Sequence, residues 1–292
     1  MMYIDGKACA FALLGQLKPL VSRFEASYSR KPTLRIIRIN DDYASKVYTE
    51  KKIKVAHSIG VDAEIIILPD NISCRDAIGV VKQYDNDPLV DGIIIQLPLP
   101  KQISKDLLLN EISPHKDVDG ISAYSLGALV NGSSAFVPCT PQGIIRLTHY
   151  IQLDVRGLDV VILGQSIIVG RPVALAFLNR GATVTVCHSA TKDLESKIKS
   201  ADVLISAMGA PGVVDPSWIK PGATVFDVSI NRHVSGKMTG DIALDECNHV
   251  GKITPVPGGV GPMTVACLQF NTCLAAMRKE NDEGLLAALA LI

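Results

Sequence analysis

The feature that most constrains the fold is an alternation of short β-branched runs with helical stretches. This spacing is typical of parallel β-sheets whose strands are joined by crossover helices. Strands are predicted at 34–39, 63–68, 92–96, 160–163, 183–186, 203–206 and 224–228. Helices are predicted at 7–28, 44–59, 73–84, 171–180 and about 263–292.

A change in composition divides these strands into two sets. Residues 113–142 are rich in Pro, Gly, Ser and Asn, which is typical of a connection between domains. The 292-residue chain is long enough for two domains, each with its own core. We therefore expect an α/β protein of two domains, with the last helical segment folding back on the first.

Composition limits the classes of partner. The 29 basic and 29 acidic residues give a formal net charge of zero without a basic block, so neither nucleic acid nor an anionic membrane is an expected partner. The start of the chain lacks the pattern of a signal peptide, and no uncharged apolar run approaches the length of a membrane span. We expect a soluble, cytoplasmic protein that acts on a small molecule.

Seven cysteines form an odd set with no Cys-x-x-Cys pair. This argues against a disulfide framework and against a zinc site, so we expect reduced thiols and no bound metal. Cys139 has the chemistry of a nucleophile, but isolated cysteines are most often small core or loop residues, and we interpret it in that way.

Lys52 lies in the middle of the face that the helix 44–59 is expected to bury. An advance of about 100° per residue gathers these residues on one face: Ser45, Tyr48, Lys52, Val55, Ala56 and Ile59. Such a lysine either extends its amine to solvent or lies in a polar hollow, where desolvation lowers its pKa toward the range useful for proton transfer. The position alone favours the first alternative, whereas the Ser45 hydroxyl and the Tyr48 ring on the same face favour the second.

A glycine turn, Gly164 to Gly170, follows the predicted strand 160–163 and precedes a helix. This arrangement brings backbone N–H groups and a helix N-terminus to a pyrophosphate. Ser166 takes the place of the second glycine of Gly-x-Gly-x-x-Gly, so the turn alone does not separate a binding site from a structural turn. The next strand ends in Cys187-His188-Ser189, without an acid for the ribose hydroxyls of NAD, which leaves room for a 2′-phosphate.

Other strand ends and loops add candidate ligand groups. Gln96 ends a strand abruptly because Pro98 and Pro100 cannot continue a central ladder, and its amide is either a binding group or a polar strand end. The acids in Lys116-Asp-Val-Asp-Gly120 lie in a loop, where most acids are solvated. Loops at 138–143 and 254–264 are dense in Pro and Gly, which favours a wall that a flat ligand can approach closely.

Together these motifs resemble the bifunctional methylenetetrahydrofolate dehydrogenase/methenyltetrahydrofolate cyclohydrolase family. The resemblance covers nearly the whole chain and is carried by six motifs: Ala44-Ser45 with Tyr48-x-x-x-Lys52, Asp91-Gly-Ile-Ile-Ile-Gln-Leu-Pro-Leu-Pro100, Lys116-Asp-Val-Asp-Gly120, Pro138-Cys-Thr-Pro-x-Gly143, Gly164-x-Ser-x-x-Val-Gly-x-Pro172 and Pro255-Val-Pro-Gly-Gly-Val-Gly-Pro-Met-Thr264. It implies a folate domain of residues 1–138 and 263–292, a Rossmann-like NAD(P)-binding domain of residues 139–262, a cleft between them, and a homodimer.

The resemblance also implies the chemistry. The expected reactions are oxidation of 5,10-methylenetetrahydrofolate to the 5,10-methenyl form with NADP, or alternatively NAD, and hydrolysis of the methenyl form to 10-formyltetrahydrofolate. By position, Lys52 is the catalytic lysine, Gln96 positions and tunes it, Tyr48 stacks on the pterin, and Asp119 binds the pterin. The other implied substrate-binding residues are Ser45, Pro98, Gly259 and Pro262. The implied cofactor-binding residues are Gly164, Gln165, Ser166, Val169, Gly170, His188, Ser189, Ala207, Gly209, Ile230 and Thr140.

Some positions depart from the pattern of the family. Gln165 stands where Arg is frequent, which weakens the prediction of NADP without pointing to NAD. Asn40 and Tyr43 stand where Gly and Pro are common, and an Asn can adopt positive φ. Ser229 replaces a usual glycine and is expected to shift the cofactor slightly.

Two other functions are compatible with parts of the pattern. One is an NAD(P)-dependent dehydrogenase of another small substrate, similar to shikimate or amino acid dehydrogenases. The other is a nucleotide-sensing module without catalysis. Tyr48 beside Lys52, with Gln96 in Gln-Leu-Pro-Leu-Pro, favours folate over the first, and the presence of Lys52, Gln96 and Asp119 together argues against the second.

Overall fold

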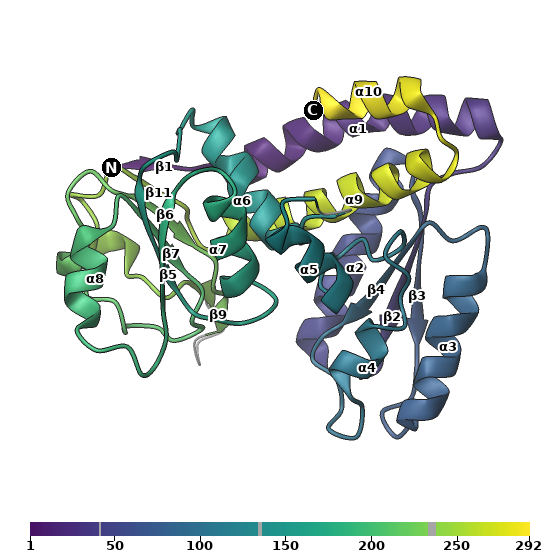
Figure 1. Ribbon diagram of the computed structural model, residues 1–292, viewed down its shortest axis with the longest axis horizontal. Helices are drawn as coiled ribbons and strands as arrows, with labels where there is room; N and C mark the ends of the chain where they lie inside the picture. Colours follow the sequence, from purple (N-terminus) through teal and green to yellow (C-terminus); the bar gives the residue numbers. More distant parts are fainter. Residues whose placement is uncertain (41, 134–135, 233–237) are drawn as a thin grey trace. The chain divides into compact units, whose positions relative to one another are not determined.

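The computed structural model describes residues 1–40, 42–133, 136–232 and 238–292, which form two compact units (Figure 1). The lysine unit contains residues 11–139 and 265–292, and the glycine-turn unit contains residues 1–10 and 140–264. This division differs from the predicted domain boundaries mainly in residues 1–10. Residues 1–10 belong to the glycine-turn unit because β1 (Met2–Tyr3) pairs in parallel with β11 (Lys252–Ile253).

The lysine unit is built on a parallel three-stranded sheet of order β3-β2-β4, with β2 at Thr33–Arg38, β3 at Asp62–Ile67 and β4 at Gly92–Gln96. Ile37, Ile93 and Ile95 pack in one apolar cluster with α3 (Cys74–Asn86) and α4 (Lys105–Leu109). Side chains alternate along a strand, so Arg38 and Gln96, which are in register, point to the opposite face. There they meet α2 (Tyr43–Ile59).

The buried face of α2 is as predicted. Asp42 caps the helix by accepting the Ser45 N–H at 2.8 Å, and Gly60 ends it with φ of 93°, in the left-handed region. Ser45, Lys52, Ala56 and Ile59 are buried, while the neighbouring Lys51 and Lys54 are exposed. The prediction missed Thr49, which is also buried and whose hydroxyl donates to the Ser45 carbonyl at 2.9 Å.

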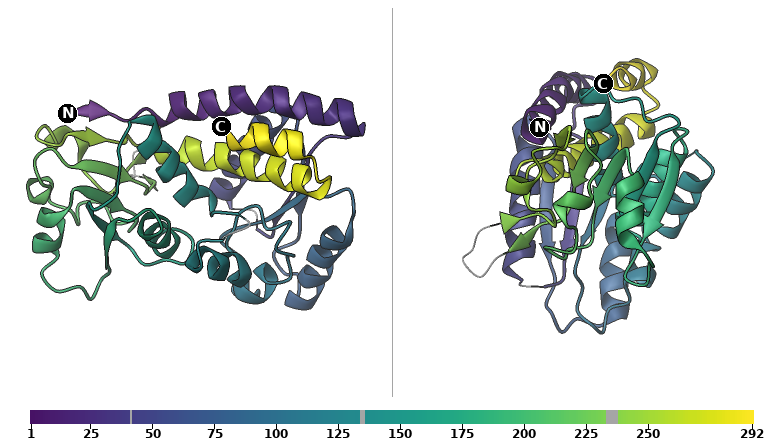
Figure 2. Two further views of the ribbon diagram at one scale, coloured as in Figure 1. Left: turned by 45° about the horizontal axis from the view of Figure 1, so that its top comes forward. Right: turned by 90° about the vertical axis from the view of Figure 1, so that its left-hand side faces the viewer.

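The C-terminal segment is helical but forms two helices, α9 (Val260–Lys279) and α10 (Glu283–Ala290), where one was predicted. Asp282 separates them because its side chain accepts the Leu285 N–H at 2.8 Å and starts α10. Both helices lie beside α1 (Gly6–Tyr28), as Figures 1 and 2 show. The Tyr28 hydroxyl donates to Asp282 at 3.0 Å, so the end of the chain returns to the lysine unit as predicted.

Helix α9 corrects the expectation that the chain has no apolar run of membrane-spanning length. It has 20 residues, and by length and composition it is apolar enough to cross a membrane. In the structure, 72% of its most apolar 18-residue window is buried. The helix therefore has the environment of a core helix of a globular protein.

Asp91 ties the start of β4 to the helical layer. Its side chain is fully buried and binds both terminal nitrogens of Arg30, at 2.7 and 3.1 Å. It also accepts the Thr33 N–H at 2.9 Å and lies 3.4 Å from the Lys279 amine on α9. This bidentate pair holds the strand that ends in Gln96.

The glycine-turn unit contains a parallel sheet of order β1-β11-β8-β7-β5-β6. Its remaining strands are β5 (Asp159–Leu163), β6 (Thr183–Cys187), β7 (Val203–Ser206) and β8 (Thr224–Asp227). The helices are α6 (Cys139–Tyr150), α7 (Gly170–Leu178) and α8 (Leu194–Ser200). A small antiparallel pair, β9 (Asn231–Arg232) and β10 (Met238–Thr239), follows β8. The carboxyl ends of the parallel strands meet at one edge, where open α/β sheets bind ligands.

The short helix α5 (Ala123–Val130) belongs to the lysine unit.

Candidate active site

Lys52 occupies a polar hollow and does not extend to solvent. Its side chain is 7% exposed, and Nζ donates to Gln96 Oε1 at 3.0 Å. The Gln96 amino group donates to the Leu97 carbonyl at 2.7 Å, which orients the amide so that its oxygen faces the lysine. Nζ also lies 4.8 Å from the centre of the Tyr48 ring. Of the two alternatives left open by the sequence, the structure has the second.

Burial lowers the pKa of Lys52, and the nearby carboxylate of Asp119 offsets part of this effect. Burial raises the pKa of Asp119, and the lysine acts in the opposite sense. The pKa of Tyr48 is raised by burial and by the same carboxylate, so its hydroxyl stays protonated. The lowered pKa of Lys52 favours the neutral amine, which is the state that can accept a proton.

Cys139 lies in the same cluster, where sequence reasoning had seen only a small core residue. Its thiol donates to the Val118 carbonyl at 3.4 Å and is hydrogen-bonded with Asp119. Burial raises its pKa well above the ordinary value, and the Asp119 carboxylate adds to this. A thiol held protonated is a poor nucleophile, which agrees with the interpretation that Cys139 is not catalytic.

The two acids of the loop before α5 have different environments. Asp117 is 1% exposed and accepts bonds from the Gly120 N–H at 3.1 Å, the Ser122 N–H at 2.9 Å and the Ser125 hydroxyl at 2.6 Å. Asp119 is half-buried in the cluster with Lys52. Asp117 therefore shapes the loop, and Asp119 is the acid that a ligand can reach.

Asn40, which stands where the family commonly has Gly, has a role for its side chain and not for a positive φ. Among the described residues, positive φ outside glycine occurs at Ser29, Gln152, Asp193 and Asn281, so Asn40 does not use this conformation. Its amino group donates instead to the Pro98 carbonyl at 2.6 Å. The side chain thus fastens the segment that follows Gln96. Tyr43 begins α2 and is exposed.

In the glycine-turn unit, two glycines are required by close packing. Gly164 has φ of 115°, and a Cβ there would lie 2.5 Å from the Ala207 carbonyl oxygen. A Cβ at Gly170 would lie 2.0 Å from the Gly164 carbonyl oxygen. Ser166 accepts the Val169 N–H at 3.1 Å and so orders the turn in place of the second glycine. Gln165 and Ser166 are exposed at this turn.

The adjoining strand ends carry further predicted residues. After β6, the His188 N–H donates to Thr191 Oγ1 at 2.8 Å, and Ser189 is exposed. After β7, the Gly209 N–H donates to Ser229 Oγ at 2.9 Å, and Ser229 in turn donates to Asp241 at 2.6 Å. The serine that replaces a usual glycine therefore joins two loops at this edge. Ile230 is exposed beside it.

Asp241 is a residue that sequence reasoning missed. It is 1% exposed and accepts the N–H groups of Met208 at 3.0 Å and Ala210 at 2.8 Å, together with the Ser206 hydroxyl at 2.8 Å. Burial acts to raise its pKa, but the hydrogen bonds from Ser229 and others outweigh it, and the pKa is lowered. One buried carboxylate thus shapes the loop that contains Ala207 and Gly209. No motif in the sequence signalled it.

The remaining predicted residues also belong to the glycine-turn unit. The Gly259 N–H donates to the Pro255 carbonyl at 2.8 Å, and a Cβ at Gly259 would lie 2.5 Å from the Thr254 Cβ, so this turn requires glycine. Thr140 Oγ1 lies 3.1 Å from Thr264 Oγ1, and Pro262 is in the first turn of α9. Within the described ranges, no group of three or more His, Cys, Asp or Glu is placed to hold a metal ion.

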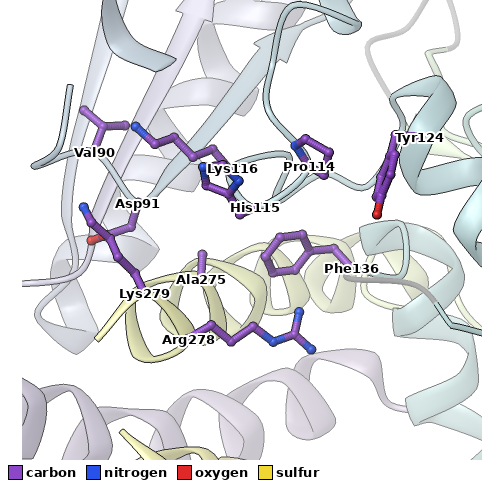
Figure 3. Close-up of a pocket in the computed structure, with 10 residues that line it drawn as sticks. All are labelled: Val90, Asp91, Pro114, His115, Lys116, Tyr124, Phe136, Ala275, Arg278 and Lys279. Atoms are coloured by element: carbon purple, nitrogen blue, oxygen red, sulfur yellow. The ribbon is translucent and has the colours of Figure 1, made fainter. Parts of the chain in front are cut away.

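A separate cavity of about 530 Å³ lies in the lysine unit (Figure 3). It is lined by Val90, Asp91, Pro114, His115, Lys116, Tyr124, Phe136, Ala275, Arg278 and Lys279. Its ammonium groups bind the protein itself, because Lys116 donates to the carbonyls of Asp85 and Asp87, at 2.6 and 2.7 Å, and Lys279 to that of Pro88. No residue of the Lys52 cluster lines this cavity, so the candidate active site is the cluster.

Comparison with known proteins decides the family. The catalytic domain of tetrahydrofolate dehydrogenase/cyclohydrolase matches residues 4–119, and the NAD(P)-binding domain of the same enzymes matches residues 138–280. The chain belongs to the tetrahydrofolate dehydrogenase/cyclohydrolase family. Membership confirms the predicted family and its two-domain α/β fold with an NAD(P)-binding domain. It favours the folate reactions over the shikimate-type alternative.

Individual relatives match nearly the whole chain. The bifunctional protein FolD of Geotalea uraniireducens is 43% identical over 277 residues, which cover 94% of this chain and 99% of the relative. The crystal structure of bifunctional FolD from Campylobacter jejuni has a TM-score of 0.93 at 40% identity and covers 95% of this chain and 99% of that one. The Trypanosoma brucei enzyme, solved with NADP cofactor and inhibitor, has a TM-score of 0.91 at 36% identity, with coverage of 95% and 98%.

The chemistry of the glycine-turn edge fits NADP. The turn from Gly164 to Gly170 leads into the N-terminus of α7, whose backbone N–H groups and dipole suit a pyrophosphate. His188-Ser189-Ala190 after β6 offers polar groups and no acid, so it does not repel a 2′-phosphate.

Replacing Ser189 by Asp tests this arrangement. A carboxylate there is expected to repel the 2′-phosphate and lower kcat/KM with NADP by at least about tenfold, or about 1.4 kcal/mol. The same quantity with NAD should fall less or rise. Ser189→Asn is the control, because asparagine has the size and shape of aspartate without its charge. Equal effects of Asp on NADP and NAD would show that Ser189 does not lie at the 2′-position.

Proposed function

We propose that the chain oxidises 5,10-methylenetetrahydrofolate to 5,10-methenyltetrahydrofolate with NADP, hydrolyses the methenyl form to 10-formyltetrahydrofolate, and performs the hydrolysis with Lys52. The observation that carries the role of Lys52 is its buried amine, 3.0 Å from Gln96 Oε1 and 4.8 Å from the Tyr48 ring centre. A desolvated lysine with a lowered pKa is suited to accept and return protons.

The residues around Lys52 bind the pterin in this proposal. The half-buried Tyr48 offers a flat ring with a protonated hydroxyl, which suits stacking on a heteroaromatic bicycle. The Asp119 carboxylate can accept hydrogen bonds from the N–H groups of the pterin. Ser45 lies on α2 with Lys52, and Pro98 follows the end of β4 at Gln96. Gly259 and Pro262 are the substrate contacts we propose for the glycine-turn unit.

In the proposed hydrolysis, Lys52 Nζ is the atom that accepts and returns a proton. Water adds to the methenyl carbon and gives up a proton, which the neutral Lys52 Nζ accepts. Gln96 Oε1 accepts a hydrogen bond from Nζ and so holds the amine in place. The lone pair of Nζ therefore keeps a fixed direction. The substrate is a cation, which further disfavours a charged amine beside it. As the ring opens, Lys52 returns this proton to the folate nitrogen that leaves, and the hydroxyl proton of the adduct is released to solvent as the formyl carbonyl forms.

In the proposed oxidation, the lysine unit only has to bind and orient the folate. When bound, NADP accepts the hydride that the methylene carbon gives up. The cluster then supplies position rather than proton transfer, because Tyr48 and Asp119 hold the same pterin. Gly164, Ser166, Val169 and Gly170 are the residues we propose for the pyrophosphate, because this turn leads into the N-terminus of α7. The other proposed contacts are Thr140, Gln165, His188, Ser189, Ala207, Gly209 and Ile230.

We also propose that the protein is a cytoplasmic homodimer. The seven cysteines are all free, which suits a reducing compartment. Strand β6 lies at the end of its sheet, and its outer edge pairs with no other described strand. Val186 on this strand and Leu178 on the neighbouring α7 are exposed. An apolar edge of this kind is suited to cover by a second copy.

Lys52→Met should lower the turnover of methenyltetrahydrofolate by roughly 10²–10⁴-fold, because it removes the proton acceptor and keeps the length of the side chain. The KM for the folate should change little, since Tyr48 and Asp119 remain. Hydrolysis is measured by the loss of methenyl absorbance.

Lys51→Met is the matched control for this variant. Lys51 is the adjacent lysine on the exposed side of α2, so its loss should leave hydrolysis unchanged. Normal hydrolysis by Lys52→Met would refute the assignment of the lysine.

Sedimentation equilibrium at micromolar concentration measures the oligomeric state. A mass of twice 31.2 kDa is expected. A charged residue at Val186, in the variant Val186→Lys, should shift the protein toward monomer, because it breaks the apolar edge of β6. A monomeric wild-type protein would contradict the proposal.

A further inference from the structure

Asn271, on α9, is a buried amide to which the sequence analysis gave no role. It is 1% exposed, and its amino group donates to the Val118 carbonyl at 2.8 Å and to the Val137 carbonyl at 3.1 Å. These partners precede it by 153 and 134 residues. Both acceptors are carbonyls, so only the amino end of the amide can face them. Its oxygen has no partner among the described residues.

The two carbonyls belong to segments that carry residues of the Lys52 cluster. The Val118 carbonyl is part of the peptide unit whose nitrogen belongs to Asp119. A peptide unit is planar, so holding this oxygen restricts the direction in which Asp119 leaves the loop. The Cys139 thiol donates to the same carbonyl at 3.4 Å, and its sulfur lies 3.8 Å from the Asn271 amino group. One amide thus joins α9 to both segments.

Apart from the Cys139 thiol, the other described hydrogen bonds of this loop hold different groups. Asp117 binds residues 120–125, and Lys116 binds carbonyls at the end of α3 and directly after it. The Lys116 carbonyl accepts the Ile93 N–H at 2.9 Å, which fixes the loop to β4. Losing Asn271 would therefore leave the rest of the loop attached, and the peptide before Asp119 would keep only the weaker hydrogen bond from the Cys139 thiol.

We propose that Asn271 is a positioning residue that holds the Asp119 carboxylate in the orientation that binds the pterin. The inference rests on the proposed role of Asp119. Binding that is equal in the ground state and the transition state affects KM and not kcat. Both reactions use one pterin site, so both should be affected alike. This pattern separates Asn271 from Lys52, which serves hydrolysis.

The test compares two variants with a control on the same helix. Asn271→Leu removes the donor at similar size, and Asn271→Asp keeps the shape but turns an acceptor toward two carbonyls. Each should raise the KM for the folate in both reactions by the same factor, about 10- to 100-fold, with kcat and the KM for NADP close to wild type. Thr272→Val removes a buried hydroxyl that donates to Leu268 within α9, and it should leave all constants unchanged.

The remaining outcomes overturn the proposal in distinguishable ways. A lower kcat with an unchanged folate KM, or failure of both Asn271 variants to fold, would make the role structural only. Asp119→Ala is run in parallel. If it raises the folate KM and the Asn271 variants do not, the positioning role is wrong while the proposed site stands. If Asp119→Ala leaves the folate KM unchanged, the proposed role of Asp119 fails, and the positioning role fails with it.

Discussion

The hydrogen bond between Lys52 Nζ and Gln96 Oε1 is the interaction on which the account of the site depends. It joins the middle of α2 to the last residue of β4 inside the lysine unit, 3.0 Å apart and away from solvent. Burying an ammonium ion is costly, and this cost exceeds the opposing effect of the Asp119 carboxylate, so the pKa of Lys52 is lowered and the neutral amine is favoured. The Gln96 amide oxygen is an uncharged acceptor. It accepts a hydrogen bond from the neutral amine and does not stabilise the charged form as strongly as a carboxylate would.

The rest of the lysine unit serves this contact. The alternation of side chains along β4 puts isoleucines toward α3 and α4 and leaves Gln96 toward α2. Asp91 and Arg30 secure the start of the same strand. The loop with Asp119 is held from within by Asp117 and, in our proposal, from α9 by Asn271. Gly92 lets this loop approach β4, because a Cβ there would lie 2.9 Å from the side chain of Val118.

Sequence reasoning reached the parts of this structure that have a local pattern. Helical periodicity placed Lys52 on a buried face, and the prolines after Gln96 marked the end of a strand. It missed Asp241 and Asn271, whose hydrogen bonds join segments that lie far apart in the chain. It also did not predict the pairing of β1 with β11, because a strand of two residues leaves no periodic signal. The position of Asn40 suggested a backbone role, whereas its side chain binds Pro98.

The most direct test of the central claim is the protonation state of Lys52 in the folded enzyme. Lysine side-chain resonances followed by NMR against pH, with Lys52→Met to assign the signal, give its pKa directly. The account predicts that Lys52 titrates below the value of about 10.4 for a free lysine. A Lys52 signal that titrates together with the exposed lysines would contradict the account, because the amine would then be charged at neutral pH and could not accept the proton of hydrolysis.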